Sequence, residues 1–146
     1  MGKNPPEGMQ RIIPMLTYED AAGAIDFLCG AFGFEERYRM EMPDGKIGHA
    51  EVSYAGCVLM LASEYEGMNL ASPKKLPARH GQIQCYVDDV DAHYAHALSA
   101  GATIVAEPQD QSYGARSYRA VDPEGHRWIF ATPLHDVPPH ASQAPA

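Results

Sequence analysis

The sequence predicts an α+β protein built from two βαβββ modules that form a shared concave sheet. The main observation is that three local signals recur at an offset of 69 residues along the 146-residue chain. The recurring pairs are Asp20 and Asp89 after a short extended run, Gly45 and Gly114 at the end of a turn, and Gly56 and Gly125 before a final strand. Because the three signals share one offset, they indicate an internal duplication.

The first half of the chain carries the elements of one module in order. Residues 11–18 are rich in Ile and Thr, which favours a strand. Asp20 then caps a helix, and Gly33 ends it because glycine adopts the left-handed conformation without strain. The apolar stripe of this helix is Ala24, Phe27, Leu28, Ala31 and Phe32. Strands are expected at 35–42, 46–54 and 57–63, with turns at 43–45 and 55–56.

The second half repeats this order. A strand is expected at 82–87, followed by a helix that Asp89 caps and Gly101 closes. Its inner face is predicted to be Val90, Tyr94, Ala97 and Leu98. Further strands are expected at 103–106, 115–121 and 126–132, the last one preceded by a turn at 122–125.

These elements predict the organisation of the chain. The two modules occupy residues 9–63 and 81–133, joined by a linker at 64–80 and followed by a disordered tail at 134–146. Each module is too small to bury both faces of its sheet alone, so the two are expected to make one domain. Residues 113–116 and the linker are expected to shape the mouth of the shared cavity.

Composition excludes several classes of protein. Hydrophobic residues make up 45% and charged residues 21%, as in ordinary globular proteins. A net charge of −8 disfavours nucleic acid as a partner, and no apolar run approaches the roughly 20 residues that cross a bilayer. The three cysteines are an odd number, and the first residues do not read as a secretory signal, so a cytoplasmic protein with reduced thiols is expected.

The motifs of the first helix and of three strands resemble a known family. Leu16-Thr17, Asp20, Ala24, Phe27 and Ala31-Phe32-Gly33 are similar to the vicinal oxygen chelate superfamily, which includes glyoxalase, bleomycin resistance and extradiol dioxygenase proteins. The motifs at 49–51, 58–61 and 122–128 resemble its phosphonate-operon-associated, glyoxalase-like subgroup most closely. The resemblance covers residues 10–133 and implies a glyoxalase/bleomycin-resistance-like fold, commonly assembled as a homodimer.

The resemblance also implies a position for a divalent metal ion. Enzymes of the superfamily hold the ion with one ligand from the first strand and one from the last strand of each module. The corresponding residues here are Ile13, Met60, Gln82 and Ile129. Isoleucine has no donor atom, a thioether suits mainly Cu(I), and one carboxamide oxygen is too weak alone. We therefore predict no metal and no cofactor.

Strand alternation predicts which side chains face the cavity. The predicted ligand-binding residues are Ile13, Met15, Thr17, Val58 and Met60 in the first module, and Gln82, Gln84, Tyr86, Tyr118, Arg127 and Ile129 in the second. Tyr118 is included because the offset of 69 places it opposite His49. Residues 12, 14 and 16 are expected to face the helix instead. Apolar walls with a few polar groups are typical of a small-molecule site.

Two groups of histidines are candidates for chemistry. His49 and Glu51 share a strand face and are candidate catalytic residues, since a carboxylate can orient an imidazole for acid–base work. The alternatives are two polar cavity residues, or a metal held with a third group. His93 and His96 lie three apart on the second helix, which suits either a metal pair or, more simply, a solvated face.

Two functions from different classes stay open. The first is a metal-free small-molecule-binding protein of the glyoxalase/bleomycin-resistance type that sequesters a drug or a metabolite. The alternative is a glyoxalase-like lyase or isomerase, or another enzyme that uses His49 and Glu51 or a displaced metal site. In both cases the expected partners are a small organic ligand and a second copy of the chain.

Overall fold

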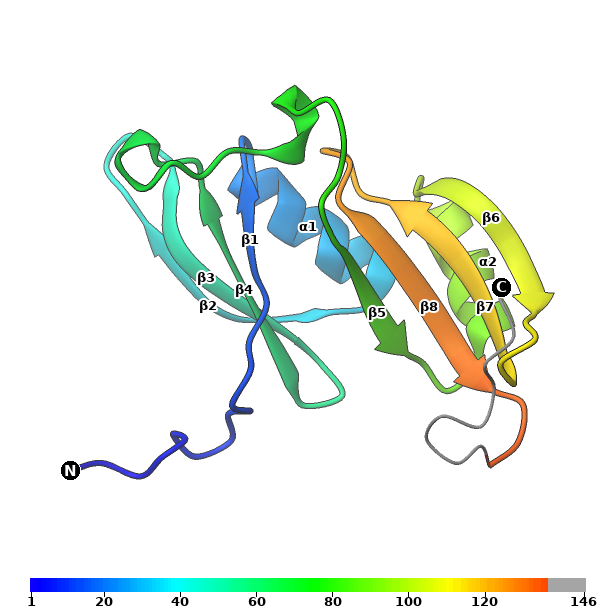
Figure 1. Cartoon of the computed structure of the whole chain (residues 1–146). Helices are drawn as coiled ribbons and strands as arrows, with labels where there is room; N and C mark the ends of the chain where they lie inside the picture. The colour runs from blue at the N-terminus through cyan, green and yellow to red at the C-terminus, as the bar shows by residue number, and fades with distance from the viewer. Residues whose placement is uncertain (137–146) are drawn as a thin grey trace. The chain divides into compact units, whose positions relative to one another are not determined.

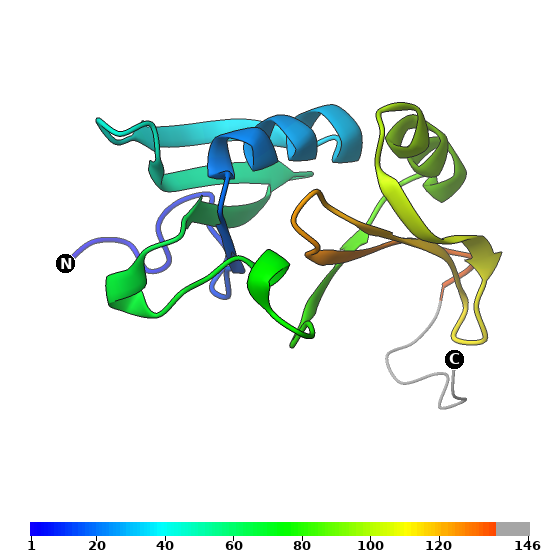
Figure 2. The ribbon, with the colours of Figure 1, turned by 90° about the horizontal axis from the view of Figure 1, so that it is seen from above.

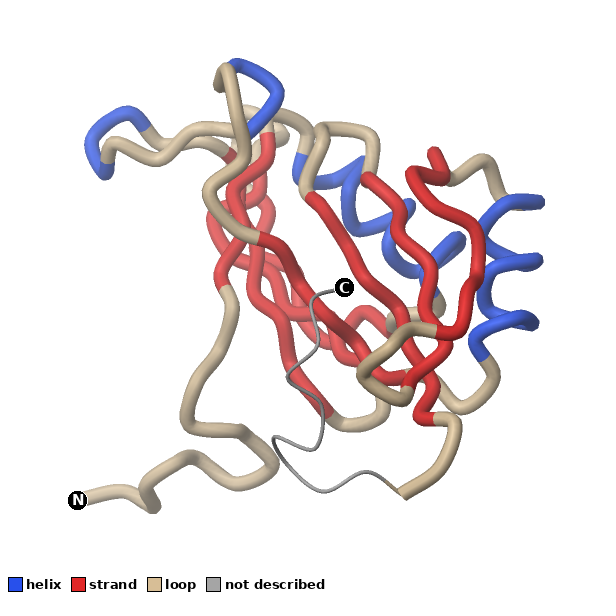
Figure 3. Tube along the Cα trace, turned by 45° about the vertical axis from the view of Figure 1, so that its right-hand side comes forward, coloured by secondary structure: helices blue, strands red, loops and turns tan. Residues whose placement is uncertain are grey.

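The computed structural model describes residues 1–136 and divides into two compact units, Met1–Pro77 and a second unit that begins at Ala78 (Figure 1). Most of the tail that was predicted to be disordered lies outside the described residues. Each unit contains one α-helix and one four-stranded sheet, and within each unit the helix covers one face of its own sheet (Figures 2 and 3). The predicted α+β fold with two βαβββ modules is therefore confirmed.

The first unit contains β1 (Met15–Tyr18), α1 (Ala21–Phe32), β2 (Glu35–Glu41), β3 (Ile47–Tyr54) and β4 (Cys57–Ser63). Its strand order is β1-β4-β3-β2, in which β1 and β4 run parallel and the other pairs run antiparallel. The second unit contains β5 (Gln82–Tyr86), α2 (Val90–Ser99), β6 (Thr103–Asp110), β7 (Ala115–Val121) and β8 (Arg127–Pro133). Its order, β5-β8-β7-β6, repeats that of the first.

The helix caps form as the sequence predicts. The Asp20 carboxylate accepts a hydrogen bond from the Gly23 amide at 3.0 Å, and that of Asp89 accepts one from the Ala92 amide at 3.1 Å. Gly33 has a φ of 81°, the left-handed conformation that ends α1. These bonds satisfy amides that the first turn of a helix leaves without an intrahelical partner.

Each core lies between a helix and one face of its sheet. In the first unit the fully buried side chains of α1 include Leu28 and Phe32, opposite Val52 and Leu61 of the sheet. Two predicted core contacts are wrong, since Ile12 is 88% exposed and Leu98 is 50% exposed. Ile12 precedes β1, which begins only at Met15, so strand alternation does not apply to it.

The turn between β7 and β8 is organised around one buried carboxylate. Asp122 is 4% exposed and accepts hydrogen bonds from the amides of Glu124 and His126, both at 3.1 Å, and from Trp128 Nε1 at 3.2 Å. Arg79 Nε donates to the Gly125 carbonyl at 2.8 Å on the outside of the same turn. This motif, which carries much of the family resemblance, therefore has a structural role.

The two sheets differ by one residue in their third strands. Met40 is aligned with His49 and Glu41 with Ile47, which leaves Gly48 as an extra residue in a β-bulge. In the second sheet the register shift between Ala106 and Gln109 leaves the extra residue on β6 instead of on β7. A shift of one residue moves side chains to the opposite face of a sheet, so the two open faces are not copies of each other.

Among residues 1–136, no helix combines the length and the apolar character that crossing a bilayer requires.

Candidate functional site

The face of the first sheet that points away from α1 carries side chains from all four strands. Met15 of β1 is aligned with Met60 of β4, and Met60 with Glu51 of β3. The neighbouring row contains Thr17 aligned with Ala62. These rows are the ones that alternation assigned to the cavity in the first module.

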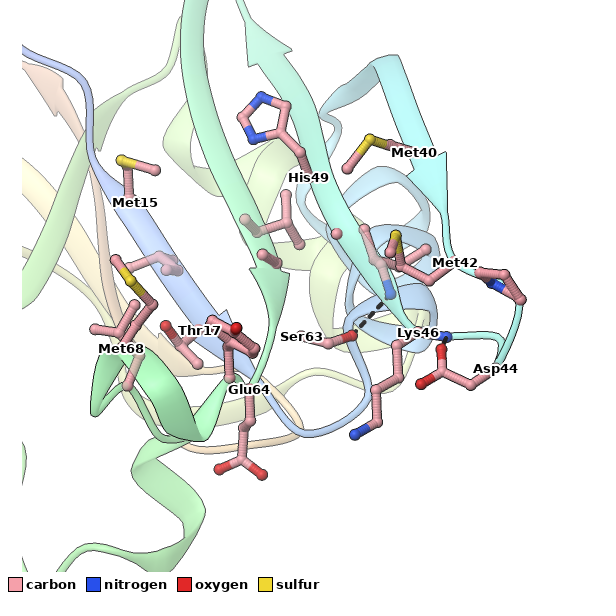
Figure 4. Close-up of a pocket in the computed structure, with 18 residues that line it drawn as sticks. Met15, Thr17, Met40, Met42, Asp44, Lys46, His49, Ser63, Glu64 and Met68 are labelled. Carbon is pink, nitrogen blue, oxygen red and sulfur yellow. Dashed lines mark hydrogen bonds between the residues drawn. The ribbon is translucent and has the colours of Figure 1, made fainter.

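A pocket of about 1010 Å³ lies over this face (Figure 4). Four of the seven methionines of the chain line it, namely Met15, Met40, Met42 and Met68. The polar groups in its wall are Thr17, Asp44, Lys46, His49, Ser63 and Glu64. A largely apolar wall with a few dispersed polar groups is the usual construction of a site for a small organic molecule.

Gly48 allows two of these methionines to lie close to the strand. A Cβ atom at Gly48 would come within 2.5 Å of Met40 Cε and 3.0 Å of Met42 Sδ. Unbranched thioether chains adapt to irregular shapes, so this part of the wall is able to adjust its shape. The bulge glycine thus contributes to the shape of the pocket as well as to the register.

A second wall comes from the segment that follows β4, which we call the strap (residues 64–76). Within it, Tyr65 and Leu70 form an isolated β-bridge, and both line the pocket together with Met68. Short 3₁₀ turns occupy Glu66–Met68 and Pro73–Lys75. The part of the sequence predicted to be a linker is therefore an ordered wall of the first unit over residues 64–76.

Glu64 anchors the strap. Its Oε2 accepts a hydrogen bond from the amide of Ser72, a fully buried residue, at 2.8 Å, and its Oε1 accepts one from Lys75 Nζ at 2.9 Å. The Ser72 hydrogen bond first, and then Lys75, lower the pKa of Glu64 below its ordinary value. A lowered pKa means that the anchor stabilises the strap above the ordinary pKa and is lost as pH falls through the lowered value.

We expect Glu64→Gln to accelerate hydrogen exchange at the Ser72 amide on the order of tenfold, because a charge-assisted hydrogen bond is replaced by a neutral one. Acidification of the wild type through the lowered pKa of Glu64 should likewise reduce the protection factor of the Ser72 amide, that is, the intrinsic exchange rate at the same pH divided by the observed rate. Glu66→Gln, in the same strap, is the control and should leave exchange unchanged. Equal exchange in Glu64→Gln and wild type would show that the strap has another anchor.

His49 and Glu51 come together as predicted. His49 Nε2 lies 3.2 Å from Glu51 Oε2, and the side chains are 31% and 21% exposed. The ring of Tyr38, on the neighbouring strand, lies 6.1 Å from the His49 ring. The pair thus has the geometry of a carboxylate that orients an imidazole at the pocket wall.

The remaining predicted ligand-binding residues have varied environments. In the first unit, Met15 is 70% exposed, whereas Val58 is 2% exposed and its amide donates to Gln10 Oε1. Ile13 is half-buried but precedes β1. In the second unit the exposed residues are Gln82, Gln84 and Tyr86, Arg127 is half-buried, and Ile129 is buried.

The predicted cavity position of Tyr118 is wrong. Its side chain is fully buried, its hydroxyl lies 2.7 Å from His93 Nδ1 of α2, and its ring contacts Tyr94 and Phe130. Because β7 lacks the bulge of β3, Tyr118 corresponds to the helix-facing Ala50, 68 residues earlier, rather than to His49. The same contacts show that His93 packs on the sheet and does not belong to a solvated helix face.

The donor set does not fit the divalent ion that the fold family implies. Met60 is aligned with Met15 and Glu51, so the last strand offers a thioether where a strong donor is needed. Across residues 1–136, no group of three or more His, Cys, Asp or Glu side chains is placed to hold a metal ion. We therefore derive no chemistry through a metal at these positions.

We expect calorimetric titration with Ni²⁺, Zn²⁺ or Mn²⁺ to show no stoichiometric binding tighter than roughly micromolar, about 8 kcal/mol. The physical reason is that neither Met60 nor Ile129 can replace the waters removed from a dication. Tight binding that persists in His49→Ala would mean that the assigned ligand positions are wrong. Tight metal binding that is abolished by His49→Ala would favour an enzyme with a displaced metal site over a metal-free binding protein.

Paired βαβββ modules, each a four-stranded sheet with one helix on one face, define the fold class of this chain. Residues 11–130 match the family described as Glyoxalase/Bleomycin resistance protein/Dioxygenase superfamily, and the chain belongs to this superfamily. It is 39% identical over 127 residues to an uncharacterized protein of Mycobacterium bovis (Mb0911c), covering 85% of this chain and 84% of that protein.

Solved structures show the same fold. The crystal structure of TioX from Micromonospora sp. ML1 is 32% identical, with a TM-score of 0.67 and coverage of 86% of this chain and 99% of that one. The fosfomycin resistance protein FosX from Mesorhizobium loti has a TM-score of 0.61 at 14% identity, with coverage of 84% and 91%. At that identity the likeness to FosX concerns the fold alone.

Proposed function

We propose that this chain is a metal-free small-molecule-binding protein of the glyoxalase/bleomycin-resistance type that sequesters a drug or a metabolite. The observation that carries the proposal is the pocket of about 1010 Å³ with its four methionines. A volume of this size accommodates a drug-sized molecule, and its thioether lining favours an apolar body over a highly charged one. The poor donor set at the family's metal positions supports binding without a metal.

The charges at the pocket wall support a ligand that is mainly apolar. The negative charge of Glu64 is compensated by Lys75, and its carboxylate also accepts a hydrogen bond from the Ser72 amide. Asp44 accepts a hydrogen bond from the Lys46 amide at 3.0 Å. His49 and Glu51 are paired with each other. Thr17 and His49, the latter oriented by Glu51, then provide a few hydrogen bonds that orient the ligand while the methionines supply contact area.

The neutral fluorophore N-phenyl-1-naphthylamine tests the pocket directly. We expect it to bind the wild type with enhanced fluorescence and Ala62→Phe on the order of thirtyfold more weakly, about 2 kcal/mol. Ala62 lies in the pocket wall, so the added ring occupies space that the probe needs. Ala106→Phe is the matched control, because Ala106 is an exposed strand residue of the other unit. Equal affinities for both variants would contradict the pocket assignment.

An enzyme is the second candidate, and the 3.2 Å approach of His49 to Glu51 is the observation that favours it. In this proposal His49 is the general base or acid and Glu51 orients it on a small organic substrate held over the sheet. If the protein only binds, His49→Gln and Glu51→Gln should change probe affinity less than threefold, roughly 0.6 kcal/mol. With a substrate turned over by the wild type, the same variants should lose turnover while retaining affinity.

Further parts of the proposal concern assembly, location and subgroup. We propose a homodimer, as is common in the superfamily that the sequence resembles, and light scattering at micromolar concentration should give twice the mass of the 15.9 kDa chain. A monomer at that concentration would contradict it.

The free cysteines Cys29, Cys57 and Cys85 support a reducing, cytoplasmic location. The motif at 49–51 supports the phosphonate-operon-associated subgroup.

A further inference from the structure

Two arginines lie close together on the open face of the second sheet. In the register of β7 and β8, Arg127 is aligned with Val121 and Ile129 with Arg119. Arg119 and Arg127 are therefore diagonal neighbours on adjacent strands, a spacing of about 7 to 8 Å that long side chains easily bridge. They point away from α2, because the alternate residues Tyr118 and Trp128 are buried on the helix side.

Two other arginines of the chain, Arg39 and Arg116, have carboxylate partners. Arg39 is bonded to Glu36 at 2.8 Å, Arg116 to Asp110 at 3.0 Å and Asp91 at 3.1 Å. Within residues 1–136, neither Arg119 nor Arg127 forms an ion pair, although both are half-buried and the chain has 19 acidic residues against 11 basic ones. Two like charges held side by side without a counter-charge repel each other, and an anion between them removes that repulsion.

The neighbours of the two arginines on this face are neutral. Gln82 is aligned with Arg127 and Gln84 with Ile129 on the parallel strand β5, so two carboxamide groups flank the arginines. Ala106 is aligned with Arg119 on the other side. The arrangement combines guanidinium and carboxamide N–H donors around the buried, apolar Ile129. No carboxylate of these strands competes for the arginines at the aligned positions.

We infer that the open face of the second sheet binds an oxyanion, a carboxylate or a phosphate group of a small molecule, between Arg119 and Arg127. Guanidinium groups match the planar, bidentate geometry of such anions, and charge-assisted hydrogen bonds to them are about twice as strong as neutral ones. Gln82 and Gln84 donate further hydrogen bonds. This site goes beyond the proposed function, since an anion can bind here whether or not an apolar molecule occupies the pocket of the first unit.

The test uses the full chain labelled with ¹⁵N and follows the arginine Nε–H signals by NMR during titration with inorganic phosphate and, separately, with acetate. We expect the Arg119 and Arg127 signals to shift together, with one apparent dissociation constant. Arg119→Gln and Arg127→Gln should each weaken binding at least tenfold, and the double variant should abolish it. Arg127→Lys keeps the positive charge but removes the planar, bidentate guanidinium group, and it should give an intermediate loss of affinity. A response to phosphate alone, or to acetate alone, would assign the class of oxyanion.

Arg37→Gln is the matched control, because it removes the same charge from an exposed position on β2. It should bind phosphate as the wild type does. If Arg37→Gln weakens binding as much as Arg127→Gln, the effect is general electrostatics and the site is refuted. Unchanged Arg119 and Arg127 signals with both anions would refute it too. The titration contains no apolar probe. Its result therefore does not depend on whether N-phenyl-1-naphthylamine binds the pocket of the first unit.

Discussion

Asp122→Ala is expected to lower the free energy of unfolding by about 3 kcal/mol, because three hydrogen bonds to a buried carboxylate are lost at once. The amides of Glu124 and His126 and the indole N–H of Trp128 all lose the hydrogen bond to this carboxylate. Trp128 is fully buried, in a region that water reaches poorly, so the loss of this hydrogen bond is more costly than at the surface. Chemical denaturation monitored by Trp128 fluorescence measures the change.

Asp44→Ala is the matched control for this prediction. Asp44 also accepts a backbone hydrogen bond in a turn, from the Lys46 amide at 3.0 Å, but it is exposed and water can replace it. We expect a loss of less than about 1 kcal/mol. Asp122→Asn should lie between the two, because the carboxamide oxygen retains one acceptor. A similar small loss for Asp122→Ala and Asp44→Ala would refute the structural role of the turn.

Phe32→Ala is expected to cost about 4 kcal/mol, because it removes a fully buried aromatic ring from the core of the first unit. The ring packs edge-on against Phe27, with centroids 4.9 Å apart, so the cavity cannot close without moving α1. Phe27→Ala is the control: the same atoms are removed from the same helix, but at a half-buried position, and we expect about half the loss. Equal losses of stability would mean that the core around position 32 collapses onto the smaller alanine side chain.

The two variants together test how the chain unfolds. Phe32 belongs to the first unit and Asp122 to the second. A module of this size has a marginal core of its own, so we expect one cooperative transition that both substitutions shift. Two transitions, each shifted by only one of the substitutions, would contradict the expectation that the chain forms one domain.

Local features were predictable from the sequence because their causes lie within a few residues. Asp20 and Gly33 bound α1 through a side-chain cap and a positive φ, and both are visible as residue types at the right spacing. The β4 boundaries were predicted without error for a similar reason, since a glycine turn precedes an unbroken apolar run. Alternation along β3 likewise brought His49 and Glu51 to one face.

The candidate site could be predicted only in part. The linker was expected to shape the mouth of the cavity, but the ordered structure of the strap was not predicted. That order depends on Glu64 reaching the Ser72 amide eight residues away, and Pro-containing polar segments usually read as linkers. Lys46 and Met40 were missed because they enter the pocket from the edge of the sheet rather than from the strands whose alternation was followed. A Met-rich pattern at 40 and 42 beside Gly48 was the available signal.

The sequence by itself determined the duplication, the order of the elements and the caps, since each depends on local backbone preferences. Only the tertiary structure decided which face of the second sheet holds Tyr118 and which holds Arg119. The offset of 69 paired Tyr118 with His49 because it ignores the bulge at Gly48 in β3, which appears only when β2 and β3 are paired. A strand has a side-chain period of two, so one unpaired residue exchanges the two faces, and an offset counted along the chain cannot detect it.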